Sequence, residues 1–297
     1  MALVLRSPYL ASGFVWLRGN LHAHSTRSDG TLEPADLCAA YLARGYDFLA
    51  LADHDLREPL AAGEAPEGLL LIDAVEVSAG GPHLLAIGGS SAIEPCEDRQ
   101  RVIDAIVADG GFAILNHPNW LHHYNHFPQC EMERLTGYAG IEIYNGVIDF
   151  LEGSALATDR WDRLLSTGRI VWGFANDDTH VAQNVGRAWN VVQATDRSEG
   201  AVFASLLAGR FYASTGVRIG RISTVGRHLA VSAPGADRIR FIGSYGRELA
   251  MVDGDEGNYT ADGGEGGYVR VECLGAGGRA AWTQPFVVTQ HPRDAPG

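Results

Sequence analysis

The stretch FVWLRGNLHAHSTRSDGTLEPADLCAAYLARGYDFLALADH, residues 14–54, contains the pattern that decides the fold. An apolar run over residues 14–21 predicts a strand. A helix is predicted to begin at Pro34 and to end at Gly45, because proline suits the first turn and glycine suits the position after the last. A second apolar run, residues 48–51, predicts a buried strand. A strand, a helix and a second strand in this order form one βα unit.

The same alternation continues to about residue 215. Further strands are predicted at residues 69–77, 84–88, 112–116, 141–144 and 170–174, and further helices at 97–108, 131–135, 155–166 and 199–208. Short connections between strands and helices predict a mainly parallel sheet. So many units in one stretch favour closure into a distorted barrel, although an open sheet fits the same pattern.

Residues 216–297 have a different sequence pattern. Strands with a period of two are predicted at residues 238–242 and 268–273, and glycine-rich turns separate them. This pattern is typical of a small antiparallel β-sandwich. The sequence therefore predicts an α/β chain with two domains, a β/α barrel over residues 1–215 and a β-sandwich over residues 216–297.

Composition limits the classes of partner. The chain has 297 residues and a formal net charge of −13, which argues against non-specific binding to nucleic acid. Its four cysteines form no CxxC pair and suit free thiols in a reducing compartment. Arg6 and Pro8 interrupt the apolar start, so neither a signal peptide nor a membrane span is expected. We expect a cytoplasmic protein.

Histidines and carboxylates gather at the ends of the predicted strands. The set consists of His22, His24, His54, Glu76, His117, Asp178 and His180. Each alone is more often an ordinary hydrogen-bonded side chain. Together they are typical of a metal centre, because the carboxyl ends of parallel strands converge on one mouth. A large His/Asp/Glu set without cysteine suits about three divalent ions such as zinc, manganese or iron.

Other candidate residues carry weaker signals. Arg27 and Arg187 are candidate partners of a substrate anion, although each is more often simply solvated. His123 lies, with His122 and His126, in an aromatic loop, residues 119–127, that is either plain surface or a lid or substrate contact beside the site. Asn145 follows a predicted strand and is a candidate for the polar wall of the substrate cleft. The chain has no GxSxG or GxxxxGK[ST] motif, and no organic cofactor is indicated.

Five segments give a more specific indication. GNLHAHSTRSDG, LALADHD, VEVS followed by PHLLAIG, ILNHP and NDDTH resemble the successive motifs of the PHP (polymerase and histidinol phosphatase) family along roughly residues 16–215. The resemblance implies a distorted seven-stranded β/α barrel, a trinuclear metal site and metal-dependent phosphoesterase activity. SLLAGRFYASTG and the following β domain resemble the single-chain hydrolase branch of that family, which includes carbamate-ester hydrolases.

The resemblance also implies a ligand set. Carried over by position, the ligands of three ions would be His22, His24, Glu76 and Asp178 for the first, Glu76, His83 and His117 for the second, and Asp29, His54 and His180 for the third. Asp29 and His83 rest mainly on the resemblance, and several members have histidine in place of Asp29. The choice between Asp177 and Asp178 stays open, with Asp178 giving the D-x-H pattern.

The expected activity follows from this centre. We expect hydrolysis of a small phosphate ester by a metal-bridging hydroxide, with Glu76, Asp178 and His180 as the catalytic residues. Hydrolysis of a carbamate, a carboxylic ester or an amide needs the same centre and is the alternative. A non-catalytic metal-binding regulatory protein is a third reading.

Overall fold

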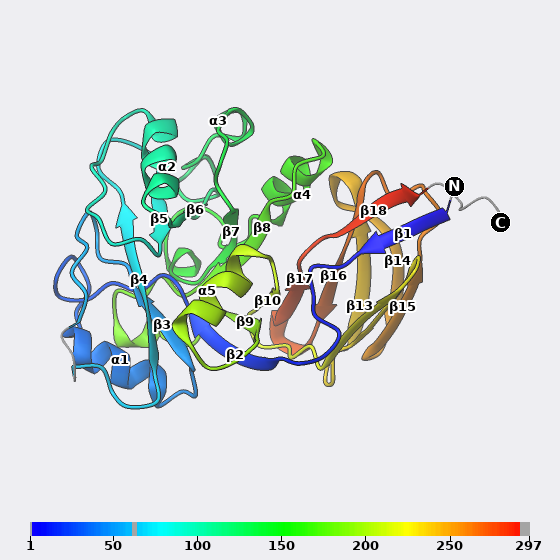
Figure 1. Cartoon of the computed structure of the whole chain (residues 1–297), viewed down its shortest axis with the longest axis horizontal. Coiled ribbons are helices and arrows are strands. Elements are labelled where there is room, and N and C mark those ends of the chain that lie inside the picture. The colour runs from blue at the N-terminus through cyan, green and yellow to red at the C-terminus, as the bar shows by residue number, and fades with distance from the viewer. Residues whose placement is uncertain (1, 61–63, 292–297) are drawn as a thin grey trace.

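The computed structural model describes residues 2–60 and 64–291. Figure 1 shows a mixed α/β part beside a part built of strands alone. The predicted α/β class is confirmed. The five helices of the described residues lie within about three residues of their predicted positions. They are α1 (Pro34–Leu42), α2 (Arg99–Ala108), α3 (Gln129–Arg134), α4 (Thr158–Ser166) and α5 (Glu199–Leu207).

Seven neighbouring strands carry the α/β part. In sheet order they are β2 (Val15–Asn20), β3 (Phe48–Leu51), β4 (Leu70–Val77), β5 (Leu84–Ile87), β6 (Phe112–Leu115), β7 (Gly140–Asn145) and β8 (Trp172–Asn176). Four of the pairings are parallel. Strand β5 runs antiparallel to both neighbours, because the short turn after β4 leaves no room for a crossover.

The two ends of this run meet. Beyond the last residues of β2 and β8, Ala23 and Thr179 form a parallel bridge, and the backbone N of His24 donates to the Thr179 carbonyl oxygen at 2.8 Å. On the edge of β8, the Asn190 side-chain amide bonds both backbone groups of Ala175, at 2.9 and 3.1 Å. These contacts bring the carboxyl ends of β2 and β8 to the same place.

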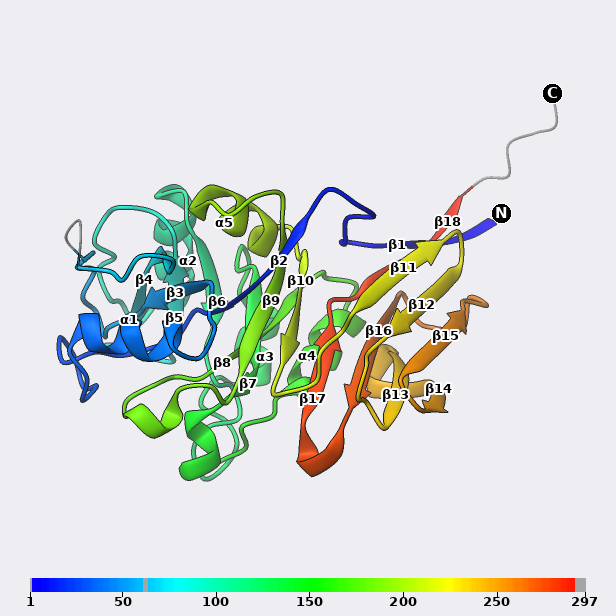
Figure 2. The ribbon, with the colours of Figure 1, turned by 90° about the horizontal axis from the view of Figure 1, so that it is seen from below.

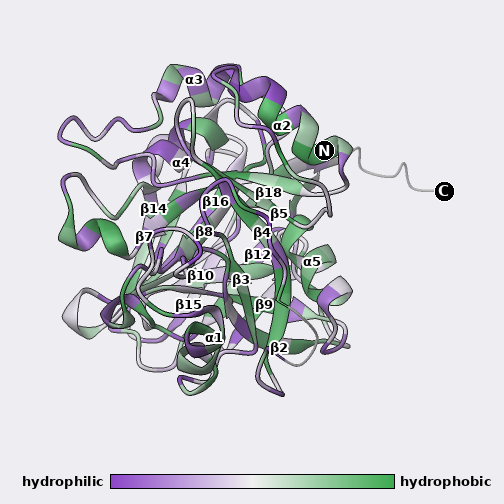
Figure 3. Cartoon of the chain, turned by 90° about the vertical axis from the view of Figure 1, so that its left-hand side faces the viewer, coloured by the Kyte–Doolittle hydropathy of each residue, from purple (hydrophilic) through white to green (hydrophobic). Residues whose placement is uncertain are grey.

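The strands are apolar and the helices cover them. Figure 3 shows mainly hydrophobic residues in β2, β4 and β9 (Trp189–Ala194) and hydrophilic residues on α3. The caps of two helices follow from sequence, since Asp98 accepts from the backbone N of Gln100 and Ser198 accepts from that of Ala201. Within the described residues, no helix is long and apolar enough to span a bilayer.

The remaining strands extend the sheet and add a second one. Beyond β9 the sheet continues through β10 (Phe211–Ser214), β17 (Ala280–Thr283), β16 (Tyr268–Leu274), β18 (Phe286–His291) and β1 (Ala2–Arg6). Strand β13 (Arg238–Gly243) pairs with β16, and β14 (Arg247–Asp253) pairs with β13. A separate sheet contains β11 (Arg221–Val225), β12 (His228–Ser232) and β15 (Glu256–Thr260). Four 3-10 turns cover Val147–Phe150 (η1), Ala182–Asn184, Ser244–Gly246 and Ala276–Gly278.

The α/β part and the all-β part are joined through the sheet (Figure 2). Strand β10 pairs with β9 on one side and β17 on the other. The first strand, β1, pairs with the last, β18. A buried ion pair between Arg270 of β16 and Asp162 of α4, 2.6 Å between Nη2 and Oδ2, adds a further link. The two-domain division at residue 215 stays a prediction.

Candidate metal centre

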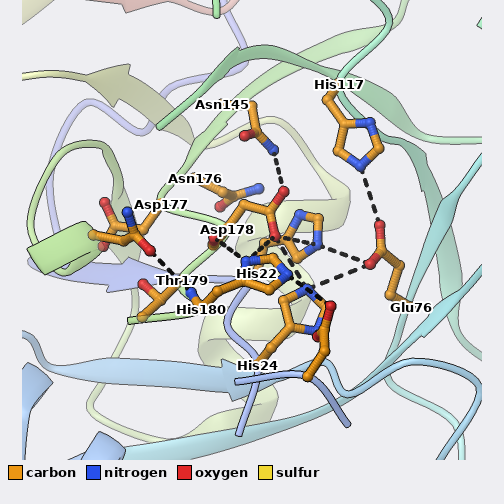
Figure 4. Close-up of polar contacts among 12 residues, drawn as sticks. His22, His24, Glu76, His117, Asn145, Asn176, Asp177, Asp178, Thr179 and His180 are labelled. Atoms are coloured by element: carbon orange, nitrogen blue, oxygen red, sulfur yellow. Dashed lines mark hydrogen bonds and ion pairs between the residues drawn. The ribbon is translucent and has the colours of Figure 1, made fainter. Parts of the chain in front are cut away.

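The seven strand-end residues of the sequence analysis converge in one place. Figure 4 shows His22, His24, Glu76, His117, Asp178 and His180. His22 and His24 follow β2, and His54 follows β3. Glu76 lies within β4 and forms an isolated bridge with His54. His117 follows β6, and Asp178 and His180 follow β8. Each side chain is placed by a strand end, since β2, β3, β4, β6 and β8 all point their carboxyl ends toward the same mouth.

Glu76 is the central carboxylate of the cluster. Its side chain is buried, and the Oε2 atom lies 3.0 Å from His54 Nδ1, 3.3 Å from His22 Nε2 and 3.4 Å from His24 Nε2. Three imidazoles therefore surround this one oxygen.

The other oxygen of Glu76 faces a different group. The Oε1 atom lies 3.1 Å from His83 Nδ1 and 3.3 Å from His117 Nε2, and Asn116 Nδ2 donates to it at 2.6 Å. His83 belongs to the turn before β5, so the antiparallel strand supplies a member of the cluster. Each oxygen of the Glu76 carboxylate therefore faces its own set of histidines.

Asp178, and not Asp177, points into the cluster. Asp178 Oδ1 lies 3.1 Å from His24 Nε2 and 3.3 Å from His22 Nε2. Its φ of 53° is unusual for a non-glycine residue, and strain of this kind gathers at functional sites. Asp177 is turned away and accepts from three backbone N–H groups, those of residues 186, 187 and 188, and from the Tyr41 hydroxyl.

A third group lies nearer the solvent. Asp29 Oδ2 lies 3.3 Å from His180 Nε2 and 3.6 Å from His54 Nε2. Asp29 Oδ1 lies 3.8 Å from His24 Nδ1. His180 Nδ1 lies 2.9 Å from the Asp178 carbonyl oxygen, to which it donates, so Nε2 is the atom left facing Asp29.

Several buried atoms of the cluster have no hydrogen-bond partner in the protein. They are His22 Nε2, both ring nitrogens of His24, His54 Nδ1, His117 Nδ1 and Asp178 Oδ1. A buried polar atom without a partner costs about 1–3 kcal/mol. Ligand atoms of His24, Asp29, His54 and His180 lie within 4.8 Å of one another, as do those of His22, His24 and Glu76. These residues therefore fit divalent cations, which would satisfy the unpartnered atoms.

Glu142 is a buried carboxylate that the sequence analysis did not include among the candidates. Its Oε1 accepts from His22 Nδ1 at 2.8 Å, which leaves His22 Nε2 directed at the cluster. Its Oε2 accepts from the backbone N of His117 at 2.9 Å and from Asn145 Nδ2 at 2.8 Å. Asn145 also donates to Asp178 Oδ2 at 3.1 Å. A carboxylate behind a histidine is a common support of metal sites.

His126 also joins the cluster. Its Nε2 accepts from the backbone N of His83 at 3.0 Å, and its ring centroid lies 4.7 Å from those of His83 and His117. Burial, followed by the fields of His117 and His83, lowers the pKa of His126 to about 2. His123, the candidate from the same loop, is exposed and lines a separate open pocket with Tyr124 and Arg160.

The carboxylates of the cluster change the pKa values of its histidines. Burial alone would lower the pKa of His22, but the carboxylates of Asp178, Glu76 and Glu142 raise it well above its ordinary value. Burial also opposes the charged form of His54, yet Asp29 and Glu76 raise its pKa to about 10. Without cations, these imidazoles therefore hold protons that an incoming ion must displace.

A cavity of about 210 Å³ opens beside the cluster. Its polar lining consists of Asp29, His54, Glu76, His83, His117, Asp178 and His180, and its apolar lining of Trp120, Val147, Ile148 and Leu151. The arrangement can hold more than one cation next to a space for a small molecule.

Comparisons with known proteins find two partial relatives. No family model matches the chain. It is 44% identical over 64 residues to a 5'-3' exoribonuclease of Haemophilus influenzae and 40% identical over 82 residues to a 3',5'-nucleoside bisphosphate phosphatase of Chromobacterium violaceum. These alignments span 23% and 28% of the relatives' own lengths.

The likeness in structure covers nearly the whole chain. A two-domain protein of Bacteroides vulgatus containing a predicted PHP-like metal-dependent phosphoesterase superposes with a TM-score of 0.56. The match covers 98% of this chain and 91% of that one, at 17% identity. The chain therefore shares the fold of this PHP-like protein. The resemblance drawn from its motifs is thereby confirmed.

The two arginines proposed from sequence do not line the cavity. Arg27 Nη1 donates to the Glu58 carbonyl oxygen, and Arg27 Nε lies 3.7 Å from a Glu58 carboxylate oxygen. Arg187 Nη2 donates to Asp149 Oδ2 at 3.0 Å, and its guanidinium lies 4.6 Å from the centre of the Phe150 ring. Both side chains have partners within the protein.

Proposed function

We propose that the chain is a metal-dependent phosphoesterase that hydrolyses a small phosphate ester at a centre of about three divalent ions. The observation that carries the proposal is the position of Glu76, whose two carboxylate oxygens face two different sets of histidines beside a cavity. Both partial relatives, a 3',5'-nucleoside bisphosphate phosphatase and a 5'-3' exoribonuclease, are named for the cleavage of phosphate esters.

The proposed ligands fall into three sets. They are His22, His24, Glu76 and Asp178 for one ion, Glu76, His83 and His117 for a second, with His126 adjacent, and Asp29, His54 and His180 for a third. When bound, such ions supply a Lewis acid for the phosphoryl oxygens and acidity for a water molecule. Zinc, manganese and iron all suit this donor set.

The residues around the ions have separate tasks in this proposal. Glu76 and Asp178 fix the positions of the cations, and Glu142 holds the His22 ring in the orientation that directs Nε2 inward. His180 lines the cavity with its Nδ1 bonded to the Asp178 carbonyl oxygen, and it is proposed to act in catalysis by holding the third ion through Nε2.

Two finer features of the fold belong to the same proposal. Residues 1–215 are proposed to form a distorted seven-stranded barrel, supported by the bridge between Ala23 and Thr179 that joins the ends of β2 and β8. Residues 216–297 are proposed to form a sandwich, supported by a shared core between the two sheets that includes Leu229 of β12 and Phe241 of β13.

A carbamate or carboxylic-ester hydrolase is the second candidate. One observation favours it, the lack of arginine among the residues that line the cavity, because a neutral ester needs no cationic side chain. An amide hydrolase or a non-catalytic metal-binding protein would share the ligands but has no such support.

Turnover of a substrate panel tests the proposal. Metal-reconstituted protein is assayed with p-nitrophenyl phosphate, bis(p-nitrophenyl) phosphate, p-nitrophenyl acetate and an aryl carbamate. We expect a phosphate ester to turn over, Glu76→Gln to lose that activity, and exposed Glu67→Gln to retain it. Turnover of the carbamate or acetate without any phosphate ester would contradict the proposal and favour the second candidate.

A further inference from the structure

One side of the cavity beside the cluster is a hydrocarbon wall. It is formed by Trp120 of the loop after β6 and by Val147, Ile148 and Leu151 of the segment after β7. Leu151 is 50% exposed, and its neighbour Phe150 is 59% exposed. Apolar side chains left open to solvent beside a polar cluster mark a binding surface, since a structural role would bury them.

The wall is held in place by the protein itself. Asp149 Oδ2 in η1 accepts from the Tyr144 hydroxyl at 2.7 Å and from Arg187 Nη2 at 3.0 Å. The backbone N of Leu121 donates to the Glu152 carbonyl oxygen at 2.9 Å and ties the Trp120 loop to the η1 segment. A wall braced at both loops is ready before a ligand arrives, which lowers the entropic cost of binding.

The cavity lacks a cationic side chain for a second anion. The chain has 23 arginines and no lysine, and within residues 2–60 and 64–291 no arginine lines the cavity. Arg27 and Arg187, the two arginines proposed as anion partners from the sequence, form ion pairs with Glu58 and Asp149. Asp29, which is 54% exposed at its side chain, adds negative charge at the mouth. A distant phosphate or carboxylate would find no partner there.

From the wall and the missing cation, we propose that the substrate carries a flat, uncharged hydrocarbon group, such as one aromatic ring, on its reacting ester. This group lies against Trp120, Val147, Ile148 and Leu151. A cavity of about 150 Å³ holds a benzene ring, so about 210 Å³ suits one ring beside an ester. The inference rests on the proposed function and narrows its substrate to aryl or similar apolar monoesters, in contrast to bisphosphates.

Binding of two phosphonates by the metal-loaded protein tests the inference without turnover. Phenylphosphonate and methylphosphonate present the same anion but differ in the ring. Isothermal titration calorimetry should give at least about tenfold tighter binding of phenylphosphonate, which corresponds to about 1.4 kcal/mol. Equal affinities would overturn the inference and leave the proposed function intact. Binding of neither phosphonate would overturn the proposed function, and the inference with it.

A charge placed on the hydrocarbon wall provides a second test of the inference. Leu151→Arg, at a half-exposed position, should weaken phenylphosphonate about tenfold and strengthen 4-carboxyphenylphosphonate. Leu207→Arg is the matched control, because Leu207 is 48% exposed on α5 and does not line the cavity. Unchanged affinity of Leu151→Arg for both compounds would contradict the seating of the ring on this wall. If Leu151→Arg does not fold, the affinities of the wild-type protein for phenylphosphonate and methylphosphonate still test the inference.

Discussion

Glu142 shows how a residue outside the ligand set can govern the centre. It fixes the His22 ring through Nδ1 and the backbone of His117 through its second oxygen. We expect Glu142→Gln to weaken metal binding roughly 10- to 100-fold, because the amide can present its donor to His22 and lose the ring orientation. Metal titration against a chelator measures the change. Glu67→Gln, at an exposed position, is the control and should bind as wild type.

The neighbouring aspartates 177 and 178 offer a matched pair of substitutions. Asp178→Asn should lower metal content, because its Oδ1 lies between the inward ring nitrogens of His22 and His24. Asp177→Asn should lower the free energy of unfolding by about 1–3 kcal/mol, because an amide cannot accept from all the N–H groups around it. Metal analysis and thermal unfolding of both variants separate the two roles. The reverse pattern would assign the ligand to Asp177.

The sequence indicated residues at strand ends but not those placed by tertiary contacts. His22, His24 and His54 could be found because a strand end aims them at a shared mouth. His126 depends on a hydrogen bond from the backbone of His83, which no spacing encodes. Glu142 carried a signal that was available, a lone acid within the apolar strand IEIYN.

At the scale of elements, Asn190 of β9 closes the free edge of β8. Its amide replaces the ladder that β8 lacks on that side, bonding Ala175 N and O and also Asn176 Oδ1. We expect Asn190→Ala to destabilise the fold by about 1–3 kcal/mol, because it leaves buried backbone groups unpaired. Thermal unfolding measures this, with exposed Asn258→Ala of β15 as the control. Equal stability of the two variants would show that the β8 edge is satisfied in another way.

Element positions were predictable where local chemistry sets them. The apolar runs located the strands of the βα units, and Pro34 and Gly45 marked the ends of the first helix. The direction of β5 was not predicted, since a short apolar run gives no direction and only the brief connection from β4 hints at a hairpin. Strand β1 was missed because its partner β18 lies at the other end of the chain.

At the scale of the whole molecule, metal binding should couple to stability. A cluster of imidazoles and carboxylates that ions complete in the native state stabilises that state by mass action, about 4 kcal/mol at a thousandfold excess over Kd. Removal of metal by a chelator should therefore lower Tm, as measured by calorimetry. A Tm that does not respond to chelator or to added metal would contradict native-state binding.

Proton release offers an independent readout of the same coupling. The pKa of His54 is about 10 before ions bind, so at pH 7 that imidazole carries a proton that coordination removes. Loading should therefore release protons and become stronger as pH rises. Titration calorimetry in two buffers of different ionisation enthalpy counts them. Equal heats in both buffers would show that no proton is displaced.

Location of the ions tests the central claim most directly. Crystals of the metal-reconstituted protein, measured at the absorption edge of the added metal, reveal each ion as an anomalous peak. We predict one peak on each side of the Glu76 carboxylate, toward His22 and His24 and toward His83 and His117, and a third among Asp29, His54 and His180. An anomalous map without a peak beside Glu76 would contradict the account.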